Sequence, residues 1–374
     1  MAPADRDRRH RGAPRDRQGP RRLQGGAGIP RSRIERLRGL LEEPLLVSAP
    51  TNVFYLTGFE SSNAALLVEP DRVRVFTDFR YAERARELEG VELEETKRHI
   101  YTDLSGRLPE RIGFEAAAVS FADHELLRSS GAELVPRYGL VESLRAVKEP
   151  EELDAIRRAA AITDRAYERM AEERFAGCTE KELVWRMTEL FQELGADEPA
   201  FAIDIAAGPT AATPHAVPGD RVIQEGDLVL VDAGAKLEGY CSDCTRTFAV
   251  GEVSDSLREI HDVTREAQQA GLDAVRAGTT GREADAAARA VITDAGYGEG
   301  FGHGLGHGLG LLVHEAPALR PESTDTLRAG NVVTVEPGIY LSGVAGVRIE
   351  DLVVVTDDGC EVLSAFTKDL ITVR

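Results

Sequence analysis

The sequence predicts a mixed α/β (α+β) protein with two folded domains behind a basic tail, and three observations support this. Residues 34–147 alternate short apolar strands with helical segments, as in "AALLVEP" and "YAERARELEG", which is typical of a small α/β domain. From residue 148 the helical segments lengthen, beginning with "EPEELDAIRRAAAITDRAYERMAEE". Within residues 148–374 one helical pattern occurs twice. We therefore place a domain boundary near Lys148.

The tail comprises residues 1–33, which contain ten Arg and three Asp among Pro and Gly and almost no apolar residue. Such a segment cannot bury enough surface to fold, so we expect it to be disordered. It lacks the apolar stretch of a secretory signal, and no apolar run in the chain is long enough to span a bilayer. We therefore expect a soluble, cytoplasmic protein without a membrane partner.

The charge of the chain excludes another class of partner. The net charge is −19, of which the tail contributes +7 and the remainder −26. Because such an acidic body repels phosphate backbones, we expect no nucleic-acid partner. Four cysteines are too few for a disulfide scaffold at this length. Cys241 and Cys244 form a C-x-x-C pair, which we interpret as two small strand residues because a structural zinc needs a second pair.

The larger region contains a weak internal repeat. The segments "AGCTEKELVWRMTELFQELGA" (176–196) and "AGTTGREADAAARAVITDAGY" (277–297) share an Ala-Gly, a Thr, a Glu and a closing Gly at an offset of 101. Chance similarity between two amphipathic helices could produce part of this. The matching order of the segments that follow favours duplication, and we predict two pseudo-symmetric α-α-β-β halves.

Four acidic residues are placed in apolar strand patterns, two in each half. In the middle of a strand an unpaired charge costs several kcal/mol unless a cation or a hydrogen bond compensates it. Arg246 and Arg348 are the basic residues closest to them in sequence. One such acid is most often structural, but four in matching strands predict a metal site. The four are Asp232, Asp243, Glu336 and Glu350.

Three of the eight histidines lie in one glycine-rich stretch, "FGHGLGHGLGLLVHEAP" (301–317). In a strand, the even spacing would put His303 and His307 on one face, while His314 could face the other way across a bend. Position 318 is Ala, so "HEAPA" is not the H-E-x-x-H pattern of helical zinc sites. Carboxylates with one imidazole suit Mn²⁺, Co²⁺, Fe²⁺ or Zn²⁺, and two metals sharing carboxylates would use five such ligands.

These motifs resemble the pita-bread metallopeptidases, most closely the aminopeptidase P and prolidase branch. The resemblance rests on "VDAGAKLEGYCSDCTRTF", "GHGLGLLVHEAP", "TVEPGIY" and "GVRIEDLVVV". The segment "TNVFYLTGFESSNAALLVEPDRVRVFTDFRY" resembles the creatinase-type domain that precedes the catalytic domain in this branch. The likeness extends from about residue 45 to residue 374. It implies a pita-bread catalytic domain in residues 148–374 and a creatinase-like domain in residues 34–147.

The resemblance also implies roles for individual residues. Two divalent metal ions, Mn²⁺ above all, would be bound by Asp232, Asp243, His307, Glu336 and Glu350, with Asp243 and Glu350 shared between them. His314 would contact the substrate and the developing oxyanion, and His215 would be the other histidine that faces the substrate. Arg348 would lie beside the shared glutamate. Glu336 is the candidate to carry a proton to the leaving nitrogen. The role of His303 stays open, with a structural hydrogen bond favoured.

The implied activity is removal of the N-terminal residue from peptides with proline in second position, as in an Xaa-Pro aminopeptidase. An Xaa-Pro dipeptidase (prolidase) is the alternative, and a non-catalytic peptide-binding relative is a third. Creatinase-like amidinohydrolases lack the ligand set, and methionine aminopeptidases usually lack the N-terminal domain. The branch commonly assembles through that domain, so we expect a homodimer or a higher homo-oligomer.

Overall fold

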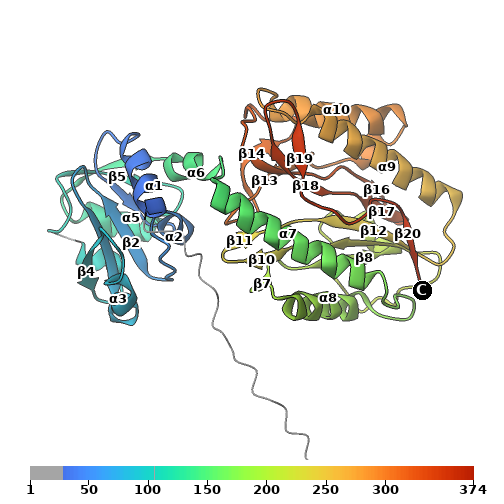
Figure 1. Cartoon of the computed structure of the whole chain (residues 1–374), viewed down its shortest axis with the longest axis horizontal. Coiled ribbons are helices and arrows are strands. Elements are labelled where there is room, and N and C mark those ends of the chain that lie inside the picture. Colours follow the sequence, from blue (N-terminus) through green and yellow to red (C-terminus); the bar gives the residue numbers. More distant parts are fainter. Residues whose placement is uncertain (1–27, 105) are drawn as a thin grey trace, which may run out of the picture.

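The computed structural model describes residues 28–104 and 106–374, which form two domains (Figure 1). The N-terminal domain is built on a mixed six-stranded sheet ordered β4-β3-β2-β1-β5-β6. Its strands are β1 (Leu45–Val47), β2 (Ala64–Val68), β3 (Val73–Asp78), β4 (Glu92–Thr96), β5 (Arg111–Glu115) and β6 (Glu133–Arg137). Its helices are α1 (Gly28–Arg38), α2 (Pro50–Thr57), α3 (Phe79–Ala85), α4 (Ile100–Asp103), α5 (Phe121–Arg128) and α6 (Leu140–Arg145).

Helix α1 corrects the predicted extent of the disordered tail, because residues 28–33 are helical. The helix is held by apolar packing, since Leu37 is fully buried, and by an ion pair between Arg33 Nε and Glu149 Oε2 (2.8 Å). A basic residue that looked like part of the tail is therefore fixed by an acid 116 positions away. Residues 1–27 lie outside the described part of the chain, so their disorder stays a prediction.

The C-terminal domain has two halves, each of which starts with a pair of helices and continues as strands. The first half contains α7 (Pro150–Met170), α8 (Glu180–Leu194), β7 (Glu198–Pro199), β8 (Asp204–Ala207), the 3-10 helix η1 (Gly208–Ala212), β9 (Leu228–Asp232), β10 (Ala235–Leu237), β11 (Tyr240–Cys241) and β12 (Thr245–Val250). The second contains α9 (Asp255–Ala274), α10 (Gly281–Asp294), η2 (Gly298–Gly300), β13 (Gly306–Gly308), β14 (Glu315–Leu319), β15 (Val332–Val335), β16 (Gly338–Leu341), β17 (Ala345–Arg348), β18 (Asp351–Val355), β19 (Cys360–Val362) and β20 (Ile371–Val373).

The repeated sequence pattern marks where corresponding helices begin and end. Thr179 caps α8 and Thr280 caps α10, each in a capping box with the glutamate three residues later, Glu182 or Glu283. The closing glycine of the first copy, Gly195, has a left-handed backbone (φ 93°) that ends α8. The residues shared by the two copies are thus the ones that set helix boundaries, and the predicted α-α-β-β halves are present.

The strands of the C-terminal domain form two main sheets, ordered β20-β12-β9-β8 and β14-β13-β15-β18-β19. Helices α9 and α10 lie along one side of this domain, and α7 and α8 along the other (Figure 1). The small sheets β11-β10-β7 and β16-β17 complete it. Across the described ranges, none of the helices combines the length and the apolar composition that crossing a bilayer requires.

The two domains share an apolar core. Buried Leu56 of the N-terminal domain belongs to the same cluster as Leu309 and Val332 of the C-terminal domain. Helix α2 also approaches the β10–β11 turn so closely that a Cβ on Gly239 would lie 3.1 Å from the ring of Phe54. Since Gly239 has a positive φ of 87° as well, this turn accepts only glycine without strain. The domains are therefore packed against one another.

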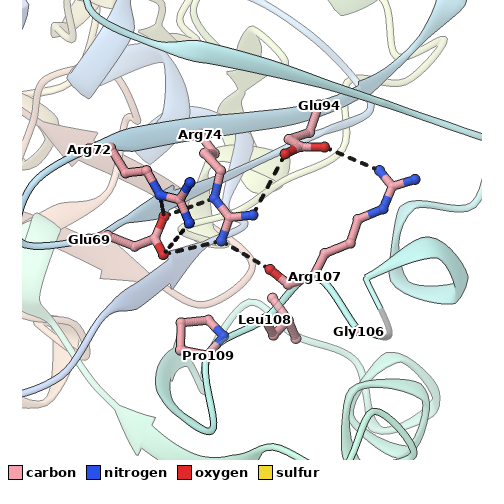
Figure 2. Close-up of a pocket in the computed structure, with 8 residues that line it drawn as sticks. All are labelled: Glu69, Arg72, Arg74, Glu94, Gly106, Arg107, Leu108 and Pro109. Atoms are coloured by element: carbon pink, nitrogen blue, oxygen red, sulfur yellow. Dashed lines mark hydrogen bonds and ion pairs between the residues drawn. The ribbon is translucent and has the colours of Figure 1, made fainter.

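The N-terminal domain also contains a cluster in which each acid is paired with arginine side chains (Figure 2). Buried Glu69 accepts hydrogen bonds from Arg72 Nε (2.9 Å) and Arg74 Nε (2.8 Å). Glu94 lies 3.7 Å from Arg74 and 3.6 Å from Arg107. We call these five residues the arginine-matched cluster. They line a cavity of about 430 Å³ together with Gly106, Leu108 and Pro109.

Candidate metal centre

The four candidate acids lie at strand ends, which corrects the prediction that they occupy strand centres. Asp232 is the last residue of β9, Glu336 directly follows β15, Glu350 directly precedes β18, and Asp243 lies in the short link between β11 and β12. Where a strand ends, the chain no longer pairs with both neighbours. The side chains can therefore converge from two different sheets on one point.

The structure brings the five predicted ligand residues together. Asp232, Asp243 and Glu350 each offer one carboxylate oxygen, and these oxygens lie within 4.8 Å of one another. His307 Nε2 lies 3.2 Å from Glu336 Oε1 and 3.8 Å from Asp243 Oδ2. Two of the residues come from the first half of the domain and three from the second. The cluster therefore sits where the halves meet.

Hydrogen bonds orient the imidazole of His307 toward the acids. Its Nδ1 lies 3.1 Å from the carbonyl oxygen of Gly308, and its backbone N–H donates to Thr334 Oγ1 (3.0 Å). This leaves Nε2 pointing at the carboxylates, as in histidines that bind metal. The surrounding glycines permit close packing, since a Cβ on Gly306 would clash with the carbonyl oxygen of Thr334 in the neighbouring strand β15.

Only one of the two candidate arginines faces the cluster. Arg348 Nη2 donates to Asp232 Oδ2 (2.5 Å), and Arg348 Nε lies 3.9 Å from Glu336 Oε2. Arg246 turns instead to Asp351, whose Oδ1 accepts from its Nη2 (2.8 Å). Four acids thus meet one guanidinium and one imidazole.

The electrostatics of the cluster favour binding of a cation. Burial, and then the neighbouring carboxylates, raise the pKa of Asp243 and Glu350 well above their ordinary range. Burial opposes a charge on His307, but the hydrogen bond to Glu336 prevails and raises the pKa of His307 to about 9. These groups therefore attract positive charge, which either protons or a metal ion can supply.

The hydrogen-bond inventory supports the same fit. Two buried carboxylate oxygens, Asp232 Oδ1 and Glu350 Oε1, have no hydrogen-bond partner within the described residues. A buried acceptor without a partner is costly, and a metal ion would satisfy both. An oxygen-rich set with one imidazole is suited to Mn²⁺, Co²⁺, Fe²⁺ or Zn²⁺.

The two histidines expected to face a substrate are both solvent-exposed. The ring centroid of His314 lies 4.3 Å from that of His307. Burial of part of its ring and the neighbouring His307 lower the pKa of His314, which favours a neutral imidazole. His215 lies in the loop after η1, next to Pro214, whose carbonyl oxygen accepts from Arg348 Nη1 (3.4 Å). Both are therefore placed beside the cluster but outside its ligand shell.

The third histidine of the glycine-rich stretch makes structural contacts. His303 Nδ1 lies 2.8 Å from the carbonyl oxygen of Gly304, and His303 Nε2 lies 2.9 Å from the Tyr340 hydroxyl, which also accepts from Arg348 Nη1 (2.8 Å). The structural role that we favoured for His303 thus has geometric support. His303 also lies before β13 rather than in one strand with His307.

Three supporting residues were not singled out from the sequence: Tyr340, Thr245 and Thr334. Thr245 Oγ1 accepts from Arg348 Nε (3.0 Å) and donates to Glu350 Oε2 (2.7 Å), so it links the arginine to an acid. Thr334 Oγ1 donates to Glu336 Oε1 (3.0 Å). Each threonine stands two positions from a candidate acid, a spacing that could have marked it. Tyr340 has no comparable sequence signal.

The C-x-x-C pair shows no sign of reactive thiols. Cys241 and Cys244 are both free and buried. Burial raises the pKa of Cys241 to about 12 and that of Cys244 well above its usual value. Since the thiolate is the reactive form, both side chains behave as small apolar residues. Cys241 lies in β11, in agreement with our interpretation from the sequence, whereas Cys244 lies in the link before β12.

Comparisons with known proteins match both domains to described families. Residues 33–147 match the Creatinase/Prolidase N-terminal domain, and residues 154–357 match Metallopeptidase family M24. The chain is 39% identical to the uncharacterized peptidase YqhT of Bacillus subtilis, over 91% of this chain and 99% of that protein.

Solved structures are similar over the same range. An Xaa-Pro dipeptidase from Bacillus anthracis has a TM-score of 0.89 at 38% identity, covering 92% of this chain and 99% of that one. An X-Pro aminopeptidase from Thermotoga maritima has a TM-score of 0.83 at 34% identity, covering 91% and 100%. With its cluster of acids and histidine between two pita-bread halves, the chain belongs to metallopeptidase family M24 and carries a creatinase/prolidase N-terminal domain.

Proposed function

We propose that this protein is a metal-dependent exopeptidase that hydrolyses the bond between an N-terminal residue and a following proline, with Xaa-Pro dipeptides as its preferred substrates. One observation carries the proposal: four buried or half-buried acids and His307 converge while a single arginine, Arg348, faces them. The likeness to an Xaa-Pro dipeptidase along nearly the whole chain supports the substrate class.

Removal of the first residue from longer peptides is the second candidate and was the first expectation from the sequence. It is supported by the likeness to an X-Pro aminopeptidase, which is slightly lower in both identity and TM-score than the likeness to the dipeptidase. A non-catalytic peptide-binding role is disfavoured, because the acids and the histidine retain an arrangement that fits metal.

Two divalent ions, for which we propose Mn²⁺, would be held by Asp232, Asp243, His307, Glu336 and Glu350. When bound, such ions supply Lewis acidity, which lowers the pKa of a water molecule and polarises the scissile carbonyl.

Side chains of the protein transfer the proton and stabilise the developing negative charge. Glu336 accepts the proton of the attacking water and delivers it to the proline nitrogen through Oε2, because Oε1 is engaged by Thr334 and His307. The neutral imidazole of His314 donates a hydrogen bond to the carbonyl oxygen as negative charge develops there, a contact worth roughly 3 kcal/mol in such sites. His215 faces the substrate from the loop after η1, and Arg348 holds Asp232 in place by a hydrogen bond.

Hydrolysis assays test the proposal. The chelator-treated protein is resupplied with Mn²⁺ and given an Xaa-Pro dipeptide, an Xaa-Pro-Yaa tripeptide and a Met-Ala-Yaa tripeptide. We expect metal-dependent cleavage of the Xaa-Pro dipeptide above all. Preference for the Xaa-Pro tripeptide would favour the second candidate, and metal binding without any cleavage would contradict both.

Variants localise the activity in the same assay. His307→Ala and Glu350→Ala should lose both bound metal and turnover. Glu361→Ala is the matched control, because its exposed carboxylate pairs with Arg157 (2.8 Å) on the surface of the same domain. It should retain both.

We also propose that the protein forms a homodimer or a larger homo-oligomer through its N-terminal domain, as the resemblance implies. Light scattering of the purified protein tests this, and a monomer at micromolar concentration would contradict it.

A further inference from the structure

One carboxylate beside the candidate metal centre takes no part in it. Asp204 lies at the start of β8, and its Cα partner in the antiparallel pairing of β8 with β9 is Asp232. Directly opposed residues of such a pair project their side chains on the same face of the sheet, with Cβ atoms about 5 Å apart. Because Asp232 points into the centre, Asp204 also faces it.

Asp204 lies next to the cluster but outside it. It is not one of the three residues whose carboxylate oxygens approach within 4.8 Å of one another. Its side chain is partly exposed, unlike the buried Asp243 and Glu350, so solvent and substrate can reach it. The charges that act on it are those of Asp232, Arg348 and His215, which all belong to the site.

Within the described residues, the side chain of Asp204 has neither a hydrogen bond nor an ion pair. The arginine whose charge acts on Asp204, Arg348, is already engaged by Asp232, Thr245 and Tyr340. Because the side chain is partly exposed, solvent water can reach this carboxylate until a substrate covers it. A substrate that displaces the water without replacing its hydrogen bonds loses affinity, whereas a cationic group recovers them as charge-assisted bonds.

We propose that Asp204 is a specificity-determining residue that selects substrates whose first residue has a cationic side chain, lysine or arginine. The inference rests on the proposed function, because it assumes that this residue's carbonyl reaches the metal centre. The α-amine of every substrate stays next to the scissile bond. The four-carbon stem of lysine carries its ammonium farther from that bond, toward a carboxylate set beside the centre.

The test compares kcat/KM for Lys-Pro, Arg-Pro and Leu-Pro between the wild type and Asp204→Asn, loaded with Mn²⁺ at pH 8. We expect the variant to lose about tenfold on the two basic dipeptides, mostly in KM, and less than about twofold on Leu-Pro. The selectivity of the wild type should shrink when salt is added, because Asp204 is partly exposed.

Two variants make the test specific. Asp220→Asn removes the same charge from the loop that carries His215, but this exposed carboxylate binds Lys181 (2.9 Å), so selectivity should not change. Asp204→Lys should shift the preference toward Glu-Pro if Asp204 contacts the side chain directly. Metal content is measured for each variant, so that a loss of ions is not read as a loss of selectivity.

Binding of free lysine and free leucine, measured by calorimetry, gives a readout that does not need turnover. Tighter binding of lysine in the wild type but not in Asp204→Asn supports the proposal even if no dipeptide is cleaved, an outcome that would sink only the proposed function. Equal losses on all three dipeptides would instead place the α-amine at Asp204 and overturn the proposal. Unchanged selectivity in Asp204→Asn would overturn it as well.

Discussion

The arginine-matched cluster of the N-terminal domain and the candidate metal centre both bury carboxylates, but they compensate the charge differently. In the first, two acids face three arginines, and Glu69 accepts hydrogen bonds from two of them (Figure 2). In the second, four acids face one arginine, and two of their oxygens have no partner within the described residues. Ionisable groups are buried in both places, but only the first cluster supplies enough protein cations to keep its acids charged.

The difference indicates which cluster is structural. Where protein cations match the acids, the network is complete and nothing further has to bind. Where they do not, the carboxylates stay unfavourable until protons or metal ions arrive. Changes to the arginine-matched cluster should therefore affect stability, and changes to the candidate metal centre should affect metal binding and catalysis.

The largest expected effect is on the barrier to hydrolysis. Glu336→Gln keeps the size of the side chain but removes the carboxylate that we propose carries the proton, so kcat should fall about 10²–10⁴-fold. Steady-state kinetics with an Xaa-Pro dipeptide, accompanied by a metal determination, measure this. A variant that retains metal and full activity would show that Glu336 does not move the proton.

The next largest effect is a loss of stability when an acid is removed from the arginine-matched cluster. Glu69→Ala leaves Arg74, whose side chain is only 6% exposed, without its buried partner and should destabilise the protein by about 3–5 kcal/mol. Urea unfolding followed by circular dichroism checks this, and kcat of the folded variant should not change. Glu92→Ala is the control, because this acid is 60% exposed and lies 3.9 Å from Arg72, and it should cost less than about 1 kcal/mol.

Addition of metal should stabilise the protein against unfolding through the candidate metal centre alone. At free Mn²⁺ about 100 times its dissociation constant, the wild type should gain about 2.7 kcal/mol over the chelator-treated protein. Calorimetric unfolding with and without Mn²⁺ measures the gain. Glu350→Ala should lose it and Glu69→Ala should keep it. An equal gain in Glu350→Ala would place the ion elsewhere.

The smallest effect concerns a buried histidine outside both clusters. His261 on α9 is buried, and its Nε2 has no hydrogen-bond partner within the described residues. Burial lowers its pKa to about 4, although Asp262 opposes this. The unfolded chain therefore binds a proton first as pH falls. The stability that neutral His261 contributes is complete above pH 6.5 and is lost between 6.5 and 4.

At pH 5 this loss should amount to about 2 kcal/mol. Urea unfolding of the wild type and of His261→Leu at pH 7.5 and pH 5 measures it. The stability of the wild type relative to the variant should fall by that amount at the lower pH. A difference that does not depend on pH would show that His261 does not titrate in this range.

Much of the fold follows from local chemistry in the sequence. The repeated Thr and Glu fix helix starts by hydrogen bonding to nearby backbone, so α8 and α10 could be predicted from short segments. The acids were recognised because carboxylates are rare in apolar strands. Their position at strand ends was not predicted, because strand pairing depends on partners more than a hundred residues away, as in the hydrogen bond from Glu350 to Thr245.

Contacts between distant segments account for what the sequence analysis missed. The extent of helix α1 depends on Glu149 across the domain junction. Arg246 and Arg348 looked equivalent in sequence, but only the fold shows that one turns to Asp351 and the other to Asp232. Tyr340 looks like an ordinary strand aromatic until its hydroxyl is seen between His303 and Arg348.

The pairing of β20 with β12 has a consequence for synthesis on the ribosome. Ile371 lies beside Phe248 in a parallel pair, so the sheet that positions Asp232 gains an edge strand translated more than 100 residues later. At about 5–20 residues per second, this interval is on the order of ten seconds. Glu336 and Glu350 also appear only within it. A nascent chain therefore carries Asp232 and Asp243 before Glu336 and Glu350, so the four acids can come together only when synthesis is nearly complete.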